Sequence, residues 1–571
     1  MIDSLLSGAV PPALIFIIGG FLVPFLPNIV RGPFMLALPV IGLFILLQVP
    51  EGSHLQFELF GLTLTAFRLD GLSKIFGIIF HLSIFLGVLY ALHVRDTVQQ
   101  VAGLVYPGAA IGGLFAGDLI TLFVFWEMMA ISSVFLIWAS RNEEAYRAGL
   151  RYMIIHITSG VILLGGVIVH YSETGSIAFD KLGLVSFGTL LIFLAFGIKS
   201  AFPLLHNWLQ DAYPKGTITS TLVLSIFTTK LAVYGLARAF PGTEQLIYIG
   251  ATMTAFPVFF AVIENDLRKV LCYSLNNQVG FMVAAIGIGT PLALNGATGY
   301  AFVNIIFEGL LFMAMGAVLL RAGTTKASEL GGLYKSMPYS TVFCIVGAMS
   351  ISAFPLFSGF VFKGMILQEA AHYHFWAWLV LLFASAGVLE HSGIKIPFFG
   401  FFGLHDSGKR VEEAPTNMLI AMAICAFLSI FIGIQPQYMY AILPYEAEYT
   451  AYTFDHVITQ LQLLVFAIFA FVVLMRSNLY PPEVRAINLD TDWFYRRLAP
   501  AIVRQLGAGI AALQTGLLNG LERQLQQFIG TVYRHHGPQG ALARTWPAGS
   551  TVLWVAILLG GMLIVLYFYR L

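Results

Sequence analysis

The sequence predicts an all-helical protein that crosses a membrane many times. Of its 571 residues, 58% are hydrophobic and only 10% are charged, whereas a soluble domain has roughly 25% charged residues. The mean hydropathy is +0.84. Apolar runs of 16 to 25 residues recur along almost the whole chain, and each has the length that a helix needs to cross roughly 30 Å of hydrocarbon. The composition and these long apolar runs exclude a soluble fold. Continuously apolar runs also indicate helices rather than the strands of a barrel.

Sixteen segments are expected to span the bilayer. They cover residues 12–30, 33–49, 71–93, 100–115, 119–138, 152–170, 183–203, 218–237, 246–263, 271–289, 298–320, 338–366, 375–404, 416–434, 460–475 and 550–569. The first run lacks a basic flank and a cleavage site of small residues, so we expect a retained helix rather than a signal peptide.

Lysine and arginine are distributed unevenly between alternate loops. Loops after odd-numbered spans carry thirteen of them, and loops after even-numbered spans carry only Arg68, Lys181 and Arg238. Because short cytoplasmic loops are enriched in basic residues, the odd loops are expected in the cytoplasm and the amino terminus outside. The scattered basic residues and the net charge of +1 argue against nucleic acid as a partner.

Changes in this pattern divide the chain into six regions. We expect N-terminal membrane helices in 1–99, a first repeat in 100–237, a second repeat in 246–404, C-terminal core helices in 405–476, a cytoplasmic or amphipathic segment in 477–549 and a terminal span in 550–571. Within the fifth region, residues 499–529 form an amphipathic helix, which is expected to lie on a membrane surface or against a partner protein. Its apolar face is formed by Leu506, Ile510, Leu513, Leu517, Leu521 and Leu525.

Ionisable residues inside the spans point to function, because a charge at the bilayer centre costs several kcal/mol unless it is paired or hydrated. A desolvated lysine binds its proton less tightly and a nearby carboxylate reverses that effect, so a lysine with a movable glutamate partner is a proton switch. A row of such switches makes a proton relay. The candidates are Glu127, Lys199, Lys230, Glu308, Lys363, His391 and Lys395, followed by His156, His206 and Glu390. A structural ion pair is the alternative for Glu127, and simple packing is the alternative for each histidine.

The lysines also suggest an internal repeat. Lys199 and Lys230 are 31 residues apart, and Lys363 and Lys395 are 32 apart, each pair on consecutive predicted spans. Five spans separate the two copies, and an odd displacement inverts the orientation, as in many secondary transporters. Pro203 and Pro355 lie near the first lysine of each pair and are expected to break the helices.

Several motifs resemble the antiporter-like subunits shared by respiratory complex I, membrane-bound hydrogenases and Mrp-type multisubunit antiporters. The match extends over most of residues 70–440, and a set of segments carries it: Gly117-Asp118-Leu119 through Trp126-Glu127, Lys199-Ser-Ala-Phe-Pro-Leu-Leu-His206, Asp266-Leu-Arg-Lys-Val-Leu-Cys-Tyr273-Ser274, Leu330-Gly-Gly-Leu333 and Phe354-Pro-Leu-Phe-Ser-Gly-Phe-Val-Phe-Lys363. Lys335-Ser-Met-Pro, Gly393-Ile-Lys-Ile-Pro-Phe-Phe and Asp490-Thr-Asp-Trp-Phe-Tyr are most similar to the D-type subunits of Mrp Na⁺/H⁺ antiporters.

This resemblance implies about 14 core transmembrane helices with two inverted five-helix repeats, to which the C-terminal amphipathic helix and an extra transmembrane helix are added. It implies that Glu127 and Lys199 form the carboxylate and lysine pair of the first half, that Lys230 connects the halves, and that Lys363 is the terminal lysine. It also implies a location in a bacterial inner membrane. Asn304 and Glu308 stand where many relatives have histidine and then lysine, so Glu308 is expected to pair with Lys363 or Lys395.

Three functions remain open at this point. The first is a proton-conducting subunit of a Na⁺/H⁺ antiporter, with other membrane subunits, protons, sodium ions and lipid as its partners. The second is a proton-pumping subunit of a redox or hydrogenase complex, in which partner subunits hold the catalytic site. The third is a membrane scaffold for an inorganic-carbon transporter. No cofactor or metal is expected, because Cys272, Cys344 and Cys425 lie in apolar runs without ligand spacing and no phosphate-binding glycine motif is present.

Overall fold

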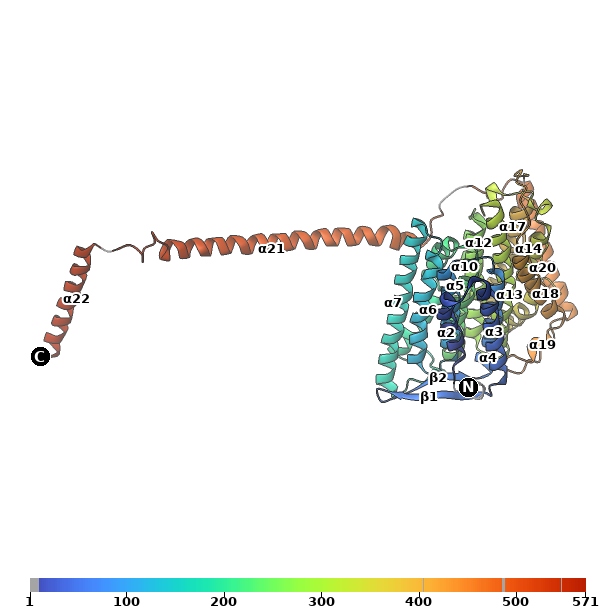
Figure 1. Ribbon diagram of the computed structural model, residues 1–571, viewed down its shortest axis with the longest axis horizontal. Coiled ribbons are helices and arrows are strands. Elements are labelled where there is room, and N and C mark those ends of the chain that lie inside the picture. Colours follow the sequence, from blue (N-terminus) through green and yellow to red (C-terminus); the bar gives the residue numbers. More distant parts are fainter. Residues whose placement is uncertain (1–9, 404, 485–487, 546, 571) are drawn as a thin grey trace. The chain divides into compact units, whose positions relative to one another are not determined.

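The structure is a computed structural model that describes residues 10–403, 405–484, 488–545 and 547–570. It has two compact units, Met1–Asn488 and Leu489–Leu571. Thirteen described helices are long and apolar enough to cross a membrane, and three shorter apolar helices accompany them. Each of the sixteen predicted spans coincides with a helix or a pair of helices, and those of the larger unit run side by side (Figure 1). The predicted polytopic helical fold is therefore confirmed.

The larger unit opens with a group of helices and one β-hairpin. Its first elements are α2 (Pro12–Leu22), η1 (Val23–Phe25), α3 (Asn28–Gln48), β1 (Gly52–Leu59), β2 (Leu62–Leu69) and α4 (Gly71–Tyr90). The hairpin lies across one end of the helices (Figure 1).

The all-helical prediction omitted this antiparallel hairpin, whose strands pair from Gly52 with Leu69 to Leu59 with Leu62. Its turn residues Phe60 and Gly61 both have positive φ angles, 52° and 78°, as two-residue hairpin turns require. Phenylalanine is an unusual residue for such a turn, and the pairing is irregular near Leu55. These two features hide the alternation of side chains by which a strand is recognised in a sequence.

Two series of helices follow. The first contains α5 (Thr97–Phe115), α6 (Leu119–Trp138), α7 (Glu143–Thr174), α8 (Phe187–Lys199), α9 (Asn207–Ala212), η2 (Tyr213–Lys215) and α10 (Ile218–Ala239). The second contains α11 (Gln245–Ile263), α12 (Leu267–Ile288), α13 (Pro291–Ala322), η3 (Ala327–Glu329), η4 (Leu333–Lys335), α14 (Pro338–Ile351), α15 (Ser358–Tyr373), α16 (Phe375–Val388), η5 (Leu389–Ile394), α17 (Lys395–Pro397) and η6 (Phe398–Phe402).

The two series repeat the same local geometry. An isolated β-bridge joins Asp118 to Ala178 in the first and Asp266 to Lys326 in the second. The spacing in the sequence from Asp118 to Asp266 equals the spacing from Ala178 to Lys326. Helix α7 lies in the sequence between the two partners of the first bridge, and α13 lies between the two partners of the second. Both helices are 32 residues long. Position by position, Gly160 of α7 therefore corresponds to Glu308 of α13, and His156 corresponds to Asn304.

A Ser-Ala-Phe-Pro-Leu segment breaks one helix in each series. It begins at Ser200 after α8 and at Ser352 after α14. The alanine and the leucine have positive φ angles in both copies, 62° and 70° at Ala201 and Leu204, and 58° and 73° at Ala353 and Leu356. The lysine spacing in the sequence thus reflects a true repeat but gives the wrong register, because Lys199 precedes its break and Lys363 follows the other one.

The span predicted over 375–404 contains two π-helical turns, η5 and η6, on either side of α17. Gly393, Pro397 and Gly400 lie in this stretch, and glycine and proline weaken the regular hydrogen-bond ladder of an α-helix. A π-helical turn inside a helix often accompanies a functional site. His391 and Lys395, both relay candidates, lie within the distorted stretch.

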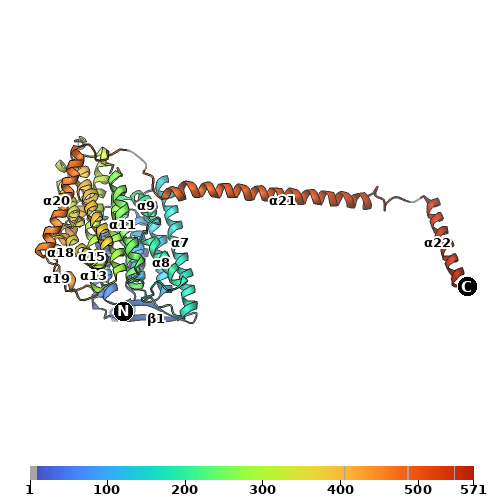
Figure 2. The ribbon, with the colours of Figure 1, turned by 180° about the vertical axis from the view of Figure 1, so that it is seen from behind.

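The larger unit is completed by α18 (Thr416–Ile434), α19 (Gln437–Tyr440) and α20 (Phe454–Arg476). The smaller unit contains η7 (Phe494–Leu498), α21 (Ala499–His536) and α22 (Ala548–Tyr569). The predicted amphipathic helix is confirmed as α21, which runs without interruption to His536 (Figure 2). Its six apolar residues are exposed: Leu506, Ile510, Leu513, Leu517, Leu521 and Leu525.

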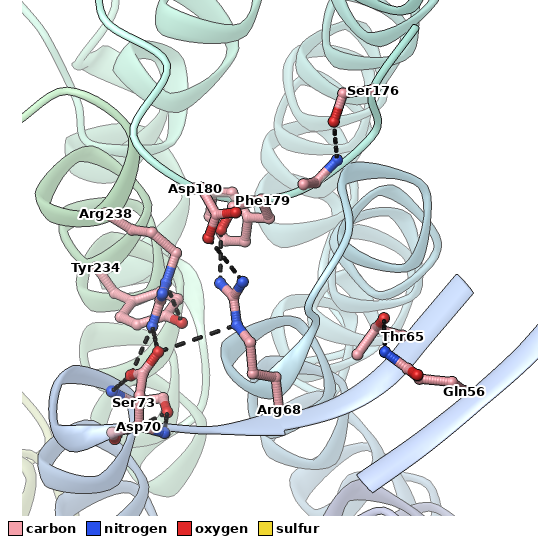
Figure 3. Close-up of polar contacts among 11 residues, drawn as sticks. Gln56, Thr65, Arg68, Asp70, Ser73, Ser176, Phe179, Asp180, Tyr234 and Arg238 are labelled. Atoms are coloured by element: carbon pink, nitrogen blue, oxygen red, sulfur yellow. Dashed lines mark hydrogen bonds and ion pairs between the residues drawn. The ribbon is translucent and has the colours of Figure 1, made fainter. Parts of the chain in front are cut away.

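Ion pairs hold the hairpin to the helices, as Figure 3 shows. Arg68 of β2 donates to Asp180 at 2.8 Å and to the carbonyl oxygen of Phe179 at 2.5 Å. Arg238 of α10 donates to both carboxylate oxygens of Asp70, each at 2.7 Å, and to the hydroxyl of Tyr234 at 2.8 Å. Arg68 and Arg238, two of the three basic residues in the loops after even-numbered spans, are therefore neutralised by carboxylates.

We expect Asp70→Asn to lower the free energy of unfolding at pH 7 by about 1–2 kcal/mol, because Arg238, whose side chain is only 10% exposed, loses its charged partner. Burial acts to raise the pKa of Asp70, but the Arg238 charge and the Ser73 and Arg238 hydrogen bonds outweigh it and lower that pKa. A lowered carboxylate pKa stabilises the fold above the unfolded value near 3.9 and less so as pH falls through the folded value. Thermal unfolding in detergent should therefore show a difference at pH 7 that shrinks below about pH 4.

The matched control is Asp180→Asn, which removes a carboxylate that is 65% exposed and should cost less than Asp70→Asn. Equal losses from the two variants at pH 7 would contradict the assigned role of the Asp70 pair.

Candidate functional site

Lys199 and Glu127 form the first charged pair. Lys199 is fully buried at the end of α8, and its Nζ donates to the carbonyl oxygen of Trp126 at 2.6 Å. The same nitrogen lies 4.3 Å from the centroid of the Trp126 ring, a cation–π distance. Glu127, the next residue on α6, interacts electrostatically with Lys199. The ammonium group is thus held by a carbonyl and an aromatic face, and the Glu127 carboxylate acts on it electrostatically.

The Glu127 side chain occupies space that Gly160 leaves open. A Cβ atom added at Gly160 would lie 1.4 Å from Oε1 of Glu127, so any larger residue there displaces the carboxylate. This Oε1 atom has no hydrogen-bond partner among the residues that the structure describes. Glu127 also lines an apolar groove of about 760 Å³ between α2, α5 and α6. One carboxylate oxygen is therefore not held by a described hydrogen bond, and the side chain borders an open groove.

His156 lies beside this pair. It is fully buried on α7, and its ring is 4.0 Å from that of Tyr152 and 4.5 Å from that of Trp208. Neither ring nitrogen has a hydrogen-bond partner within the described part of the chain, and the charge of Lys199 acts on the ring. His206 is buried at the break before α9, with its ring 4.6 Å from that of Phe256.

Lys230 and Glu308 connect the two repeats. Lys230 is buried on α10 and donates to the carbonyl oxygen of Ser225 at 3.2 Å. Glu308 is buried on α13 and accepts a hydrogen bond of 2.7 Å from the amide of Asn304. The two charged groups interact electrostatically. The structure thus places Glu308 with Lys230 of the first repeat, whereas the sequence suggested Lys363 or Lys395.

Lys363 lies at the second helix break. It is buried on α15 and donates to the carbonyl oxygen of Ile351, the last residue of α14, at 3.0 Å. A helix end leaves its last carbonyl groups unpaired, and a cation there is favoured by the helix dipole. Its Nζ is 5.8 Å from the centroid of the Tyr300 ring, and Glu308 acts electrostatically on Tyr300. Tyr300 therefore lies between the repeat junction and this lysine.

His391 lies between the last two lysines. It is fully buried, and the charges of Lys395 and Lys363 both act on it. Its Nδ1 is 2.8 Å from the hydroxyl of Ser392, which in turn donates to the hydroxyl of Ser274 at 2.8 Å. The second ring nitrogen has no partner among the described residues.

Lys395 ends the series and has a partner that sequence reasoning missed. Its Nζ donates to the carbonyl oxygen of Val262 at 2.6 Å and forms an ion pair of 2.8 Å with Glu483. Glu264 and half-buried Glu390 also act on this lysine electrostatically. Glu483 was missed because it lies outside the predicted spans, where a glutamate carries no burial signal in the sequence.

Nine of the ten candidates thus form three groups rather than one hydrogen-bonded wire, and His206, at the break before α9, is assigned to none of them. Glu127, Lys199 and His156 form one group, Lys230 and Glu308 a second, and Lys363, His391, Lys395 and Glu390 a third. No hydrogen bond or ion pair joins Lys199 to Lys230 within the described residues. The hydroxyl groups of Ser225, Thr228 and Thr229 are buried on the helix that carries Lys230. Proton transfer between groups requires water or side-chain movement.

The chain is similar to several known proteins. A family model described as "NADH:quinone oxidoreductase/Mrp antiporter, TM" matches residues 116–389. The chain is 26% identical to the D subunit of the Na(+)/H(+) antiporter of Alkalihalophilus pseudofirmus, over 75% of this chain and 94% of that protein. It is 27% identical to hydrogenase-4 component B of Escherichia coli K12, over 67% of this chain and 64% of that protein, which is less than two thirds of the relative.

The fold is similar to that of a chain in respiratory complex I from Thermus thermophilus. The TM-score is 0.68 with 19% sequence identity, and the match covers 79% of this chain and 99% of that one.

Proposed function

Since the chain belongs to the family of antiporter-like membrane subunits that NADH:quinone oxidoreductases and Mrp antiporters share, we propose that it is a proton-translocating subunit of a multisubunit cation/proton antiporter. One observation carries the proposal. Lys230 of the first repeat and Glu308 of the second are both buried, on helices α10 and α13 that pack against each other, and each acts electrostatically on the other. We further propose that sodium is the exchanged cation and that other membrane subunits complete the assembly in a bacterial inner membrane.

In this proposal the lysines carry the proton and the carboxylates control its release. A buried ammonium group is stable only with a counter-charge or acceptors around it. When Glu127 moves away or takes up a proton, Lys199 retains only the Trp126 carbonyl and ring, and its proton becomes easier to transfer. His156 can accept that proton, because neither of its ring nitrogens is committed to a described partner.

The same logic continues through the second half. Glu308 balances Lys230 at the junction, and Lys363 is held by the open carbonyl at the end of α14. His391 lies under the influence of both Lys363 and Lys395, which suits it to pass a proton between them. The proposed relay therefore comprises Glu127, Lys199, Lys230, Glu308, Lys363, His391 and Lys395, with His156, His206 and Glu390 as auxiliary groups.

A second candidate is a subunit of a redox-driven proton pump. The observation that favours it is the 27% identity to hydrogenase-4 component B over 441 residues. In that assembly, electron transfer in a partner would supply the energy, and the same buried groups would move the protons.

Inverted membrane vesicles separate the two candidates. The whole gene cluster is expressed in cells that lack their own antiporters, with the gene for this chain either intact or disrupted, and a pH gradient is formed by respiration. We expect added Na⁺ to collapse the gradient only when the gene is intact, while added K⁺ has a smaller effect. A fluorescent pH indicator reports the change.

If Na⁺ has no effect with the intact cluster, the sodium antiporter proposal is wrong. A gradient that then forms only on addition of an electron donor to the partner subunits would support the redox-driven pump.

A further inference from the structure

The segment that follows α20 places a carboxylate on the last lysine of the proposed relay. Glu483 lies in the loop after α20, beyond Pro481 and Pro482. Its side chain is only 8% exposed, and that of Lys395 is fully buried. The ion pair between them measures 2.8 Å. Glu483, a loop residue outside the predicted spans, is thus buried against the Lys395 side chain in a distorted helical stretch.

Other groups around this pair are also charged or polar. Glu264, after the end of α11, forms an ion pair of 2.8 Å with Lys269 and accepts a hydrogen bond of 3.2 Å from Asn488. Glu390 acts electrostatically on Lys395 and on Tyr480, and Glu483 also acts on Tyr480. The cluster is thus built from α11, α12, η5, α17 and the segment after α20. It lies at the end of the helices where Arg268 and Lys269 are found, which the loop bias assigns to the cytoplasm.

We propose that Glu483 is the residue through which Lys395 exchanges protons with water at this end of the protein. The transfer is simple: the Lys395 ammonium gives one N–H proton to the Glu483 carboxylate, which leaves a neutral amine and a carboxylic acid, and the acid then releases the proton to water. The reverse sequence takes a proton up. This role rests on the proposed proton-translocating function and extends it to a residue outside the membrane spans.

The environment of Glu483 favours such an exchange. Burial raises the pKa of Glu483 and the nearby Glu264 charge adds to that rise, although the charge of Lys395 and its hydrogen bond act in the opposite direction. A carboxylate with a raised pKa holds a proton at a pH closer to neutral. The side chain of Glu483 is 8% exposed but both carboxylate oxygens are buried, so release of the proton to water requires a movement of this side chain.

Transport in the vesicles described above tests the proposal with Glu483→Gln, Glu483→Asp and the control Glu448→Gln, which changes an exposed glutamate in the loop before α20. We expect Glu483→Gln to lower the initial rate of Na⁺-dependent proton movement at least about 10-fold. Glu483→Asp, which keeps a titratable group, should recover most of the rate. The control should match the unmodified protein. The rate is measured from pH 6 to 9, and Glu483→Gln should flatten the pH dependence.

Three outcomes are distinguishable. If the unmodified cluster does not exchange sodium for protons, the proposed function fails and not this inference alone. If the cluster is active and Glu483→Gln has an unchanged rate and pH profile, the exit role is wrong. If Glu483→Gln loses activity in parallel with loss of partner subunits on purification, Glu483 is a structural anchor, which also overturns the exit role.

Discussion

Replacement of Lys199 by arginine should abolish sodium-dependent proton movement although the positive charge remains. An arginine guanidinium does not release its proton under these conditions, so it can satisfy the Trp126 carbonyl and Glu127 but cannot take part in a relay. We expect Lys199→Arg and Lys199→Ala both to lower the initial rate by about 100-fold or more. Vesicles that contain the complete gene cluster provide the measurement.

Comparison of these two variants separates proton transfer from structural support. If Lys199 only balanced the charge of Glu127, arginine would preserve activity and alanine would not. The matched control is Lys181→Ala, which removes an exposed lysine in the loop before α8 and should leave the rate unchanged. Immunoblots of the vesicles establish that each variant reaches the membrane in equal amount. Transport by Lys199→Arg at the unmodified rate would rule out a relay through this residue.

Reversal of the charge of Glu308 should be nearly as damaging, and a second change should partly repair it. Glu308→Lys places two buried ammonium groups at the junction with Lys230, so we expect a loss of about 100-fold. Addition of Lys230→Glu restores an opposite-charge pair with the two partners exchanged. We expect the double variant to recover at least about 10-fold over Glu308→Lys alone, since the effects of electrostatically coupled residues are not additive.

The control for this pair is Glu173→Gln, which removes an exposed carboxylate at the end of α7. It should transport at the unmodified rate. A double variant that is no better than Glu308→Lys would mean that the electrostatic interaction of Lys230 with Glu308 does not support transport.

Much of the candidate site could be predicted because charged residues are rare in apolar spans. Glu127, Lys199, Lys230 and Lys363 stood out in the sequence by their surroundings alone, and all four are found near a carbonyl, a ring or a carboxylate in the folded chain. The cost of an unpaired charge in hydrocarbon makes this inference physical rather than statistical.

The interaction partner of each charged residue was harder to predict than its membership of the candidate site. Hydrophobic periodicity locates a helix and the residues on it, but it does not say which helices pack together. The pairing of Glu308 with Lys230 depends on the contact of α13 with α10, and that of Lys395 with Glu483 depends on the return of a loop to the helices. Both interactions join residues that are far apart in the sequence.

The register of the repeat shows the same limit. Equal spacing of lysines suggested that Lys199 and Lys363 were equivalent, yet the two Ser-Ala-Phe-Pro-Leu segments are the equivalent positions. Five identical residues with matching backbone angles are stronger evidence than two charges, because the backbone geometry depends on the local sequence. The repeated segment can be recognised in the sequence, whereas the positive φ angles of its alanine and leucine cannot.

Those left-handed residues store conformational strain at the two helix breaks. Ala201, Leu204, Ala353 and Leu356 have φ angles between 58° and 73°, a conformation that costs a non-glycine residue about 1–2 kcal/mol. Each break therefore stores about 2–4 kcal/mol. Movement of one elementary charge across 100 mV is worth about 2.3 kcal/mol. The strain stored in one break is thus comparable with the work of moving one or two elementary charges across such a potential.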